Sequence, residues 1–285
     1  MSNRELEQHV AQAGCFHSRA ATHAGTANRL NEDAYVNRPD LGLWAVADGA
    51  GGHESGEVAS AEVAGLLQTV GEGLSAGEVL LEVRSRLEGA HARLRKMASA
   101  RGAGVMVATT VVVVLARDEH FACLWAGDSR AYLWRGHALT RITRDHTLVQ
   151  AMVESGEITE AESFGHPQGN VITNAIGADN DFLELEKRTG QLMPGDRLLL
   201  CSDGLFKAIS EEQVAELLSG DGDGGAERLV IAALAAQATD NITVVTIAFD
   251  ASQRLTSSEA ERAGASIATA PEVTEYTVEP GPKPA

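Results

Sequence analysis

Several aspartates stand at the ends of predicted strands, where their carboxylates could share one cation. They are Asp33, Asp48, Asp128, Asp203 and Asp240. Asp48 and Asp203 follow the apolar runs WAVA and LLLCS, and each precedes a glycine. An Asp-Gly pair often forms a hairpin turn, but each of these two is followed by a helical pattern instead of a second strand. Acids gathered beside small residues that admit close backbone approach are typical of a hard-cation site.

The ligand types narrow the identity of the cation. Histidine and cysteine are absent from most of these positions, which favours Mg²⁺ or Mn²⁺ over Zn²⁺. The scattered cysteines, Cys15, Cys123 and Cys201, form no disulfide framework and no zinc pattern. Carboxylates this close together would repel one another without a metal. The residues alone therefore support the hypothesis of a binuclear metal hydrolase.

Length, composition and charge exclude other classes of protein. The chain has 285 residues, enough for one large domain or two small ones, and 44% of them are hydrophobic. Its formal net charge of −17 opposes binding to a phosphate backbone, and no basic run supplies a positive patch. The start of the chain lacks an apolar stretch of signal-peptide length, and the apolar run 105–116 is too short to cross a bilayer. We expect no nucleic-acid partner, no membrane span and a cytoplasmic location.

Hydrophobic patterns in the first half of the chain predict the elements that position these acids. A buried run predicts a strand over 41–47, and apolar spacings of three and four predict helices over 57–70 and 80–97. Closely spaced strands follow at 105–116, 121–126, 131–134 and 139–143. Links of hairpin length join the first two of these strands and the last two, so both pairs must be antiparallel.

Hydrophobic patterns in the second half of the chain again alternate between strands and helices. They predict strands over 182–189 and 197–202, helices over 211–218 and 226–238, and a last strand over 242–249. Near-continuous apolar strands indicate burial on both faces of a sheet, and the two helix pairs lie far apart in the sequence. We therefore predict an α+β fold, a four-layer α-β-β-α sandwich of two mainly antiparallel sheets flanked by helix pairs.

Composition sets the limits of the domain. Residues 1–15 are expected to form an N-terminal extension, with a helix over the first dozen residues. The catalytic domain is expected over 16–250. Residues 251–285 have no apolar periodicity and carry four of the seven prolines in their last fifteen residues, so we expect a disordered tail there.

Motifs in a fixed order give the chain a family resemblance. They are NED (31–33), VADGAGGHESGEVAS (46–60), ATT (108–110), AGDSRAYL (126–133), TRDH (143–146), HP through NVIT to IG (166–177), CSDGL (201–205) and DNITVV (240–245). Together they resemble the bacterial metal-dependent protein phosphatases, the type 2C serine/threonine phosphatases. The resemblance covers roughly residues 16 to 250, and the order and spacing of the motifs make it specific.

The resemblance implies a metal site in the cleft between the sheets, with two Mn²⁺ or Mg²⁺ ions. The implied metal-site residues are Glu32, Asp33, Asp48, Gly49, Asp128, Asp203 and Asp240. In the family pattern Asp48 bridges both ions and the Gly49 carbonyl binds one of them. Asp203 and Asp240 complete the other ion's site, whereas Glu32 and Asp33 hold metal-bound waters. Asp128 belongs to a third, weaker site.

The resemblance also implies a mechanism and a substrate class. A water bridging the two ions attacks phosphorus in line, so no covalent phosphoenzyme forms. Asp33 is expected in the catalytic group, and His53 is placed to protonate the leaving serine or threonine oxygen; the alternative is a glycine-loop histidine that only packs. Residues 145–180 correspond to a flap that helps to select protein substrates. We expect a monomer that acts on phosphoproteins made by a cognate serine/threonine kinase.

Two positions depart from the family pattern. Asn28 stands where the family usually has a phosphate-binding arginine, with Arg29 one step along. Adjacent side chains of an extended segment point to opposite sides, so we expect Arg29 to face away. Lys207 replaces an acid that often contributes to the third metal site. These departures support an alternative, a phosphatase-like protein that binds phosphoproteins or a partner without hydrolysis.

A cysteine-based phosphatase is a further alternative, and the residues argue against it. Such an enzyme needs an arginine six positions after its cysteine, to hold the phosphate in a two-pronged grip. At that spacing from Cys201 the chain has Lys207. We therefore expect no thiolate attack.

Overall fold

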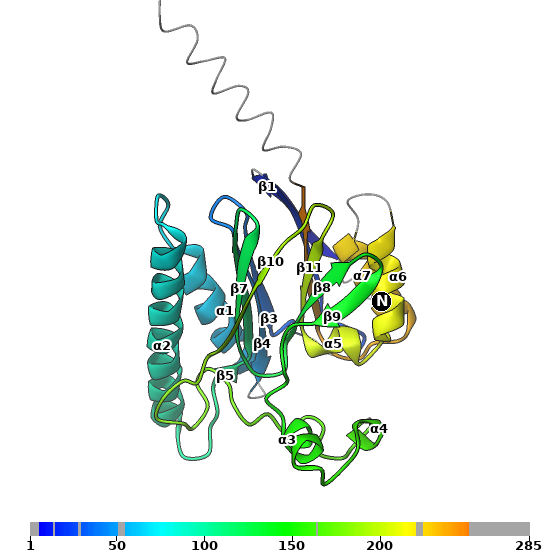
Figure 1. Cartoon of the computed structure of the whole chain (residues 1–285). Coiled ribbons are helices and arrows are strands. Elements are labelled where there is room, and N and C mark those ends of the chain that lie inside the picture. Colours follow the sequence, from blue (N-terminus) through cyan, green and yellow to red (C-terminus); the bar gives the residue numbers. More distant parts are fainter. Residues whose placement is uncertain are drawn as a thin grey trace, which may run out of the picture.

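The architecture is a sandwich of two antiparallel sheets (Figure 1). The computed structural model describes residues 6–13, 15–27, 30–50, 55–163, 165–220 and 225–250. The first sheet has the order β1 (Glu7–Ala13), β2 (Phe16–His23), β12 (Ile242–Phe249), β11 (Arg197–Cys201), β8 (Arg130–Arg135) and β9 (Ala138–Arg141). The second has the order β10 (Glu186–Gln191), β7 (His120–Ala126), β6 (Val111–Arg117), β4 (Leu43–Ala50) and β3 (Asp33–Arg38), and β5 (Ala108–Thr109) pairs with β4.

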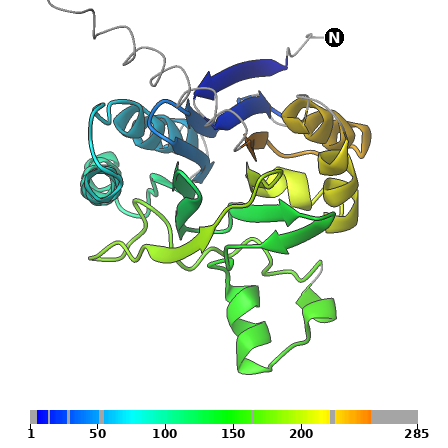
Figure 2. The same cartoon turned by 45° about the horizontal axis from the view of Figure 1, so that its top comes forward.

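Helices cover the outer face of each sheet. α1 (Ser55–Gln68) and α2 (Ala76–Arg101) lie against the second sheet, and α6 (Glu211–Ser219) and α7 (Gly225–Ala235) lie against the first (Figure 1). The short α5 (Asp203–Phe206) follows β11 directly. α3 (Leu148–Ser155) and α4 (Glu160–Ser163) stand out from the layers at one end (Figures 1 and 2). The predicted four-layer α+β sandwich is confirmed.

Three hydrophobic clusters fill the three spaces between the four layers. The central cluster joins the two sheets, with Trp44 and Trp125 of one sheet packed with Val245 of the other. An outer cluster packs α1 and α2 on the second sheet, and its counterpart packs α6 and α7 on the first. Because both faces of each sheet are buried in this way, the strands read as apolar runs. The two sheets are therefore a rigid support for the residues at their ends.

Two expectations about the elements need correction. The helix expected over the first dozen residues is wrong, because residues 7–13 form β1 and pair with β2 in antiparallel register. The open edge of β2 offers backbone hydrogen bonds that outweigh a weak local pattern. The single strand expected over 105–116 is divided into β5 and β6, which flank Thr110.

The remaining elements lie close to their expected positions. The last strand, Ile242–Phe249, has the expected limits, and the strand expected over 182–189 is shifted to β10. In the described part of the chain no helix is long and apolar enough to cross a membrane. The expected tail, 251–285, lies outside the described residues.

Candidate active site

Strand ends bring the predicted acids together at one end of the two sheets. Asp33 opens β3 and faces Asp48 of β4 directly in the antiparallel pair. Asp203 follows β11, and Asp128 lies in the turn between β7 and β8. Each of these carboxylates, together with Asp240 just ahead of β12, contributes to the electrostatic potential at Asp48. The acids predicted from separate strand ends are therefore gathered in one cluster.

The cluster is unfavourable for negative charge. Asp128 and Asp203 are buried, whereas Asp33 and Asp48 keep partial contact with solvent and Asp240 is exposed. Burial raises the pKa of Asp33 and that of Asp128 to about 7, and neighbouring carboxylates add to both shifts. Burial and then the Asp33 charge raise the pKa of Asp48 well above its usual value. A cation in the cluster would relieve these penalties.

The residues present fit a hard divalent cation. The Oδ1 atoms of Asp33 and Asp128 are buried and have no hydrogen-bond partner among the described residues. Oxygen ligands of this kind suit Mg²⁺ or Mn²⁺. No group of three or more His, Cys, Asp or Glu side chains in the described ranges is arranged to hold an ion as it stands. The donor set fits a metal, and its carboxylates must adjust to bind one.

Backbone contacts hold Asp48 in place. Its carbonyl accepts hydrogen bonds from the Thr110 backbone N–H at 2.8 Å and from the Thr109 hydroxyl at 2.9 Å. The next residue, Gly49, donates its N–H to the Glu32 carbonyl at 3.1 Å. A Cβ on Gly49 would lie 2.3 Å from the Gly56 carbonyl oxygen, so a larger residue cannot occupy this position. The glycine after Asp48 is required because the start of α1 packs directly on the end of β4.

A glycine also sets the position of Asp128. Gly127 has a φ of +112°, and a Cβ there would lie 2.4 Å from Cβ of Thr110. This backbone conformation and this close approach both favour glycine. The turn after β7 can therefore press against Thr110 and carry Asp128 into the cluster.

Two residues that support the cluster were not predicted as functional. Ser202 donates a hydrogen bond to Oδ2 of Asp33 at 2.7 Å. The Asn241 side chain accepts from the Glu32 backbone N–H at 2.8 Å and donates to the carbonyls of Ala24 and Leu30 at 3.0 and 3.1 Å. Both residues lie beside a predicted ligand within the CSDGL and DNITVV motifs, and that adjacency was the available signal.

Lys207 forms a bridge at the edge of the cluster. Its ammonium is bonded to Oδ2 of Asp203, four residues earlier, and donates to Oδ1 of Asn170 at 2.8 Å. Its charge also offsets part of the rise in the pKa of Asp128 that burial causes. Lys207 therefore acts on Asp128 through its charge, but its direct carboxylate partner is Asp203.

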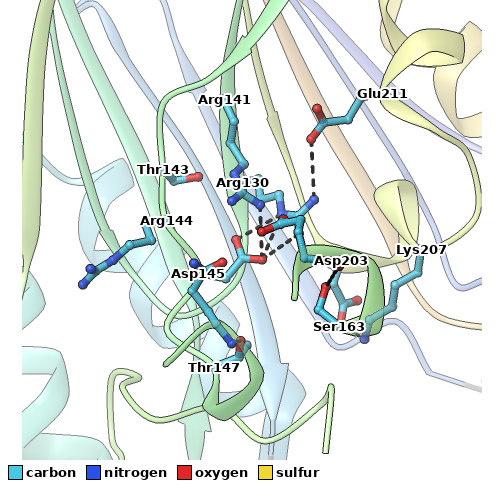
Figure 3. A network of polar contacts seen from close by, with 12 residues as sticks. Arg130, Arg141, Thr143, Arg144, Asp145, Thr147, Ser163, Asp203, Lys207 and Glu211 are labelled. Atoms are coloured by element: carbon cyan, nitrogen blue, oxygen red, sulfur yellow. Dashed lines mark hydrogen bonds and ion pairs between the residues drawn. The ribbon is translucent and has the colours of Figure 1, made fainter. Parts of the chain in front are cut away.

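A polar hollow of about 790 Å³ adjoins the cluster. Asp128 and Lys207 line it on one side, and residues of α3 and α4 line it on the other. Arg130 donates to Asp145 through Nε at 3.0 Å and through Nη2 at 2.6 Å (Figure 3). The Arg130 guanidinium also lies 3.5 Å from the centre of the Phe206 ring. The first residues of the expected flap are therefore fixed to the first sheet.

Some predicted residues cannot be placed or do not join the site. Asn28, Arg29 and His53 lie outside the described residues. Cys201 is fully buried within β11, and burial raises the pKa of its thiol. A buried protonated thiol is not a nucleophile, in agreement with the expectation that no thiolate attack occurs.

Comparisons with known proteins agree on one family. The family model described as protein phosphatase 2C matches residues 21–221. The serine/threonine protein phosphatase PstP of Mycobacterium tuberculosis is 34% identical over 227 residues, which are 79% of this chain and 43% of that protein. The chain therefore spans less than half the length of that relative.

Solved structures share the fold along almost their whole length. The structure of PppA, described as a key regulatory component of the T6SS in Pseudomonas aeruginosa, has a TM-score of 0.76 at 34% identity, covering 85% of this chain and 100% of that one. The catalytic domain of PstP in complex with two manganese ions has a TM-score of 0.69 at 32% identity, covering 82% and 98%. The family resemblance expected from the motifs is confirmed.

Proposed function

The chain belongs to the protein phosphatase 2C family, and from that premise we propose that it hydrolyses phosphoserine and phosphothreonine in proteins with the help of Mn²⁺ or Mg²⁺. The observation that carries the proposal is the carboxylate cluster, with buried oxygens of Asp33 and Asp128 that have no partner in the described residues. Such oxygens fit hard divalent cations.

In this proposal two ions are held at the strand ends. The residues that would hold them are Glu32, Asp33, Asp48, Gly49, Asp203 and Asp240, with Asp128 as a weak third site. Bound there, the ions lower the pKa of water and offset the charge of the phosphoryl group. The manganese complex of the PstP catalytic domain supports this number of ions.

Hydrogen bonds within the chain hold the proposed metal-site residues in position around the reacting group. Ser202 holds Oδ2 of Asp33, so that Oδ1 is left to face the cluster. The hydrogen bonds of Asn241 fix the segment that carries Glu32. We assign His53 the role of general acid for the leaving oxygen. Asn28 stands at the position where the phosphate would approach, and Arg29, next to it, is expected to face away. The partly enclosed hollow beside α3 and α4 would receive the protein segment around the phosphorylated residue.

Phosphate release tests the proposal. A phosphothreonine peptide is incubated with the protein in Mn²⁺, in Mg²⁺ and in EDTA, and free phosphate is measured. We expect release with either metal, none in EDTA, and none from Asp203→Asn, while the exposed control Glu88→Gln on α2 behaves as wild type. A folded protein that binds the peptide without releasing phosphate would favour the alternative, a phosphatase-like binding protein.

We further propose that the protein is a cytoplasmic monomer that reverses the action of a cognate serine/threonine kinase. The similarity to a protein described as a serine/threonine protein phosphatase motivates the link to such a kinase. Light scattering after gel filtration would give the mass of the particle, and a dimer would contradict the monomer proposal. Cell fractionation would test the location.

A further inference from the structure

Among the described residues, Lys207 is a cation that contacts the carboxylate cluster, through Asp203, and its partners leave it available for another anion. Its side chain is 38% exposed and lines the polar hollow together with Asp128 and Asn170. An ammonium group has three N–H donors. The described residues provide two acceptors, Oδ2 of Asp203 and Oδ1 of Asn170. One donor is therefore left for a ligand in the hollow.

The other basic residues that line the hollow are already engaged. Arg130 is bound to Asp145 by a two-pronged pair of hydrogen bonds, and Glu211 lies 3.8 Å from its Nη1. Arg141 lies 3.7 Å from the same Asp145 carboxylate. Asp145 and Glu211 together offset the charge of Arg130, and Arg141 shares the Asp145 carboxylate (Figure 3). Lys207 differs because its only carboxylate partner in the described chain belongs to the cluster that is proposed to bind metal.

A divalent cation at Asp203 would change the surroundings of Lys207. The ion and the ammonium would then share one carboxylate, and like charges this close repel one another. The neutral amide oxygen of Asn170 cannot replace the lost negative charge. A phosphate monoester dianion can, because it offers several oxygens to an ammonium at the edge of the metal site.

We propose that Lys207 binds a phosphoryl oxygen of the substrate and so supplies a phosphate-binding cation of this site. The inference rests on the proposed phosphatase function and adds a specificity-determining residue to it. In this role the Lys207 ammonium loses its ion pair with Asp203 when metal binds. It keeps its hydrogen bond to Asn170 and points into the hollow.

The test compares phosphate affinity with metal affinity in matched variants. Lys207→Met removes the charge at nearly constant length, Lys207→Arg keeps it, and Lys187→Met removes an exposed charge from β10 as the control. Titration calorimetry of inorganic phosphate into the Mg²⁺-loaded protein measures phosphate binding. Electron paramagnetic resonance of free Mn²⁺ measures metal binding without any turnover, and KM and kcat for a phosphothreonine peptide complete the set.

The inference predicts that Lys207→Met loses phosphate affinity without losing metal affinity. In Lys207→Met, phosphate binding should weaken about tenfold, as the loss of one charge-assisted contact worth about 1.4 kcal/mol would produce. Mn²⁺ should bind as tightly as before or more tightly, because its competitor at Asp203 is gone. KM should rise more than kcat falls, Lys207→Arg should restore most of the phosphate affinity, and Lys187→Met should change nothing.

Two results would overturn the inference. One is unchanged phosphate binding in Lys207→Met, and the other is a loss of phosphate affinity that merely follows a loss of Mn²⁺ affinity, since Lys207 would then act only through Asp203. The failure of the proposed function looks different, because the wild-type protein would release no phosphate from any peptide. The calorimetric comparison still decides the role of Lys207 in that case.

Discussion

Asp33 and Asp48 lie directly opposite each other on neighbouring antiparallel strands, so two carboxylates face each other across one rung of the sheet. Like charges in this position destabilise a sheet. Burial raises the pKa of both residues. The pairing of β3 with β4 nevertheless holds the two residues in register, so the sheet sets the backbone positions of this part of the site.

Neutralising one member of this pair should stabilise the metal-free protein while abolishing its activity. In Asp48→Asn the amide carries no charge to repel Asp33, and we expect a gain of about 1 kcal/mol, or about 2–4 °C in melting temperature for a domain of this size. Calorimetry in EDTA measures the shift, and phosphate release in Mn²⁺ measures the activity. Glu88→Gln, which removes an exposed charge from α2, is the control and should alter neither. A lower melting temperature for Asp48→Asn in EDTA would contradict the repulsion.

Metal binding should raise the melting temperature of the wild-type protein. A ligand that binds only the folded state adds about 2.7 kcal/mol at a concentration of 100 times its dissociation constant, which corresponds to roughly 5–11 °C here. A thermal-shift titration with Mn²⁺ should therefore show a rising melting temperature that EDTA reverses. Asp203→Asn should flatten the titration curve. A wild-type curve that does not move with Mn²⁺ would argue against a metal site in the carboxylate cluster.

The layers of the fold were predictable because buried strands and helices have recognisable apolar patterns in the sequence. The last strand, Ile242–Phe249, is apolar on both faces and was predicted with its observed limits. β1 was missed because a strand at the edge of a sheet is defined by its backbone pairing with β2. The strand expected over 105–116 is interrupted at Thr110, which lies between β5 and β6. The Thr110 hydroxyl forms a hydrogen bond with the Ser129 hydroxyl at 2.8 Å. Such a contact is fixed by tertiary structure.

The acids of the site could be predicted one by one, but their relations could not. Strand-end position and motif spacing marked Asp48 and Asp203, since both follow apolar runs. The facing of Asp33 and Asp48 depends on strand register, which only the assembled sheet determines. The bond between Lys207 and Asp203 is a contact between residues four apart on one helical turn. The link from Lys207 to Asn170 joins residues 37 positions apart and has no local signature.

Cys201 should be dispensable for catalysis. Burial within β11 raises the pKa of its thiol, so a thiolate is not available at neutral pH. We expect Cys201→Ser to keep the kcat of the wild type, with a lower melting temperature because a hydroxyl replaces a buried thiol. Turnover of a phosphothreonine peptide at a temperature where both proteins are folded measures this. Complete loss of turnover in a folded variant would instead indicate attack by the thiolate.

Breaking the pair formed by Arg130 and Asp145 should cost far more stability than breaking an exposed pair. Their side chains are only 16% and 10% exposed, and Nη2 of Arg130 lies 2.6 Å from Oδ2 of Asp145. Removing one partner of a buried pair costs about 3–5 kcal/mol. In Asp145→Asn we expect the lower end of that range, because Tyr132 and Glu211 still face Arg130. This should lower the melting temperature by roughly 6–12 °C.

An exposed ion pair on α1 and α2 provides the matched control for this prediction. Arg93 lies 2.9 Å from Glu62, with side chains 53% and 34% exposed. Since such pairs contribute at most about 1 kcal/mol, Glu62→Gln should shift the melting temperature by no more than about 4 °C. Calorimetry of both variants in the same buffer gives the comparison. Equal small shifts would show that Arg130 does not depend on Asp145, and that the start of the 145–180 segment is fixed to the first sheet by other contacts.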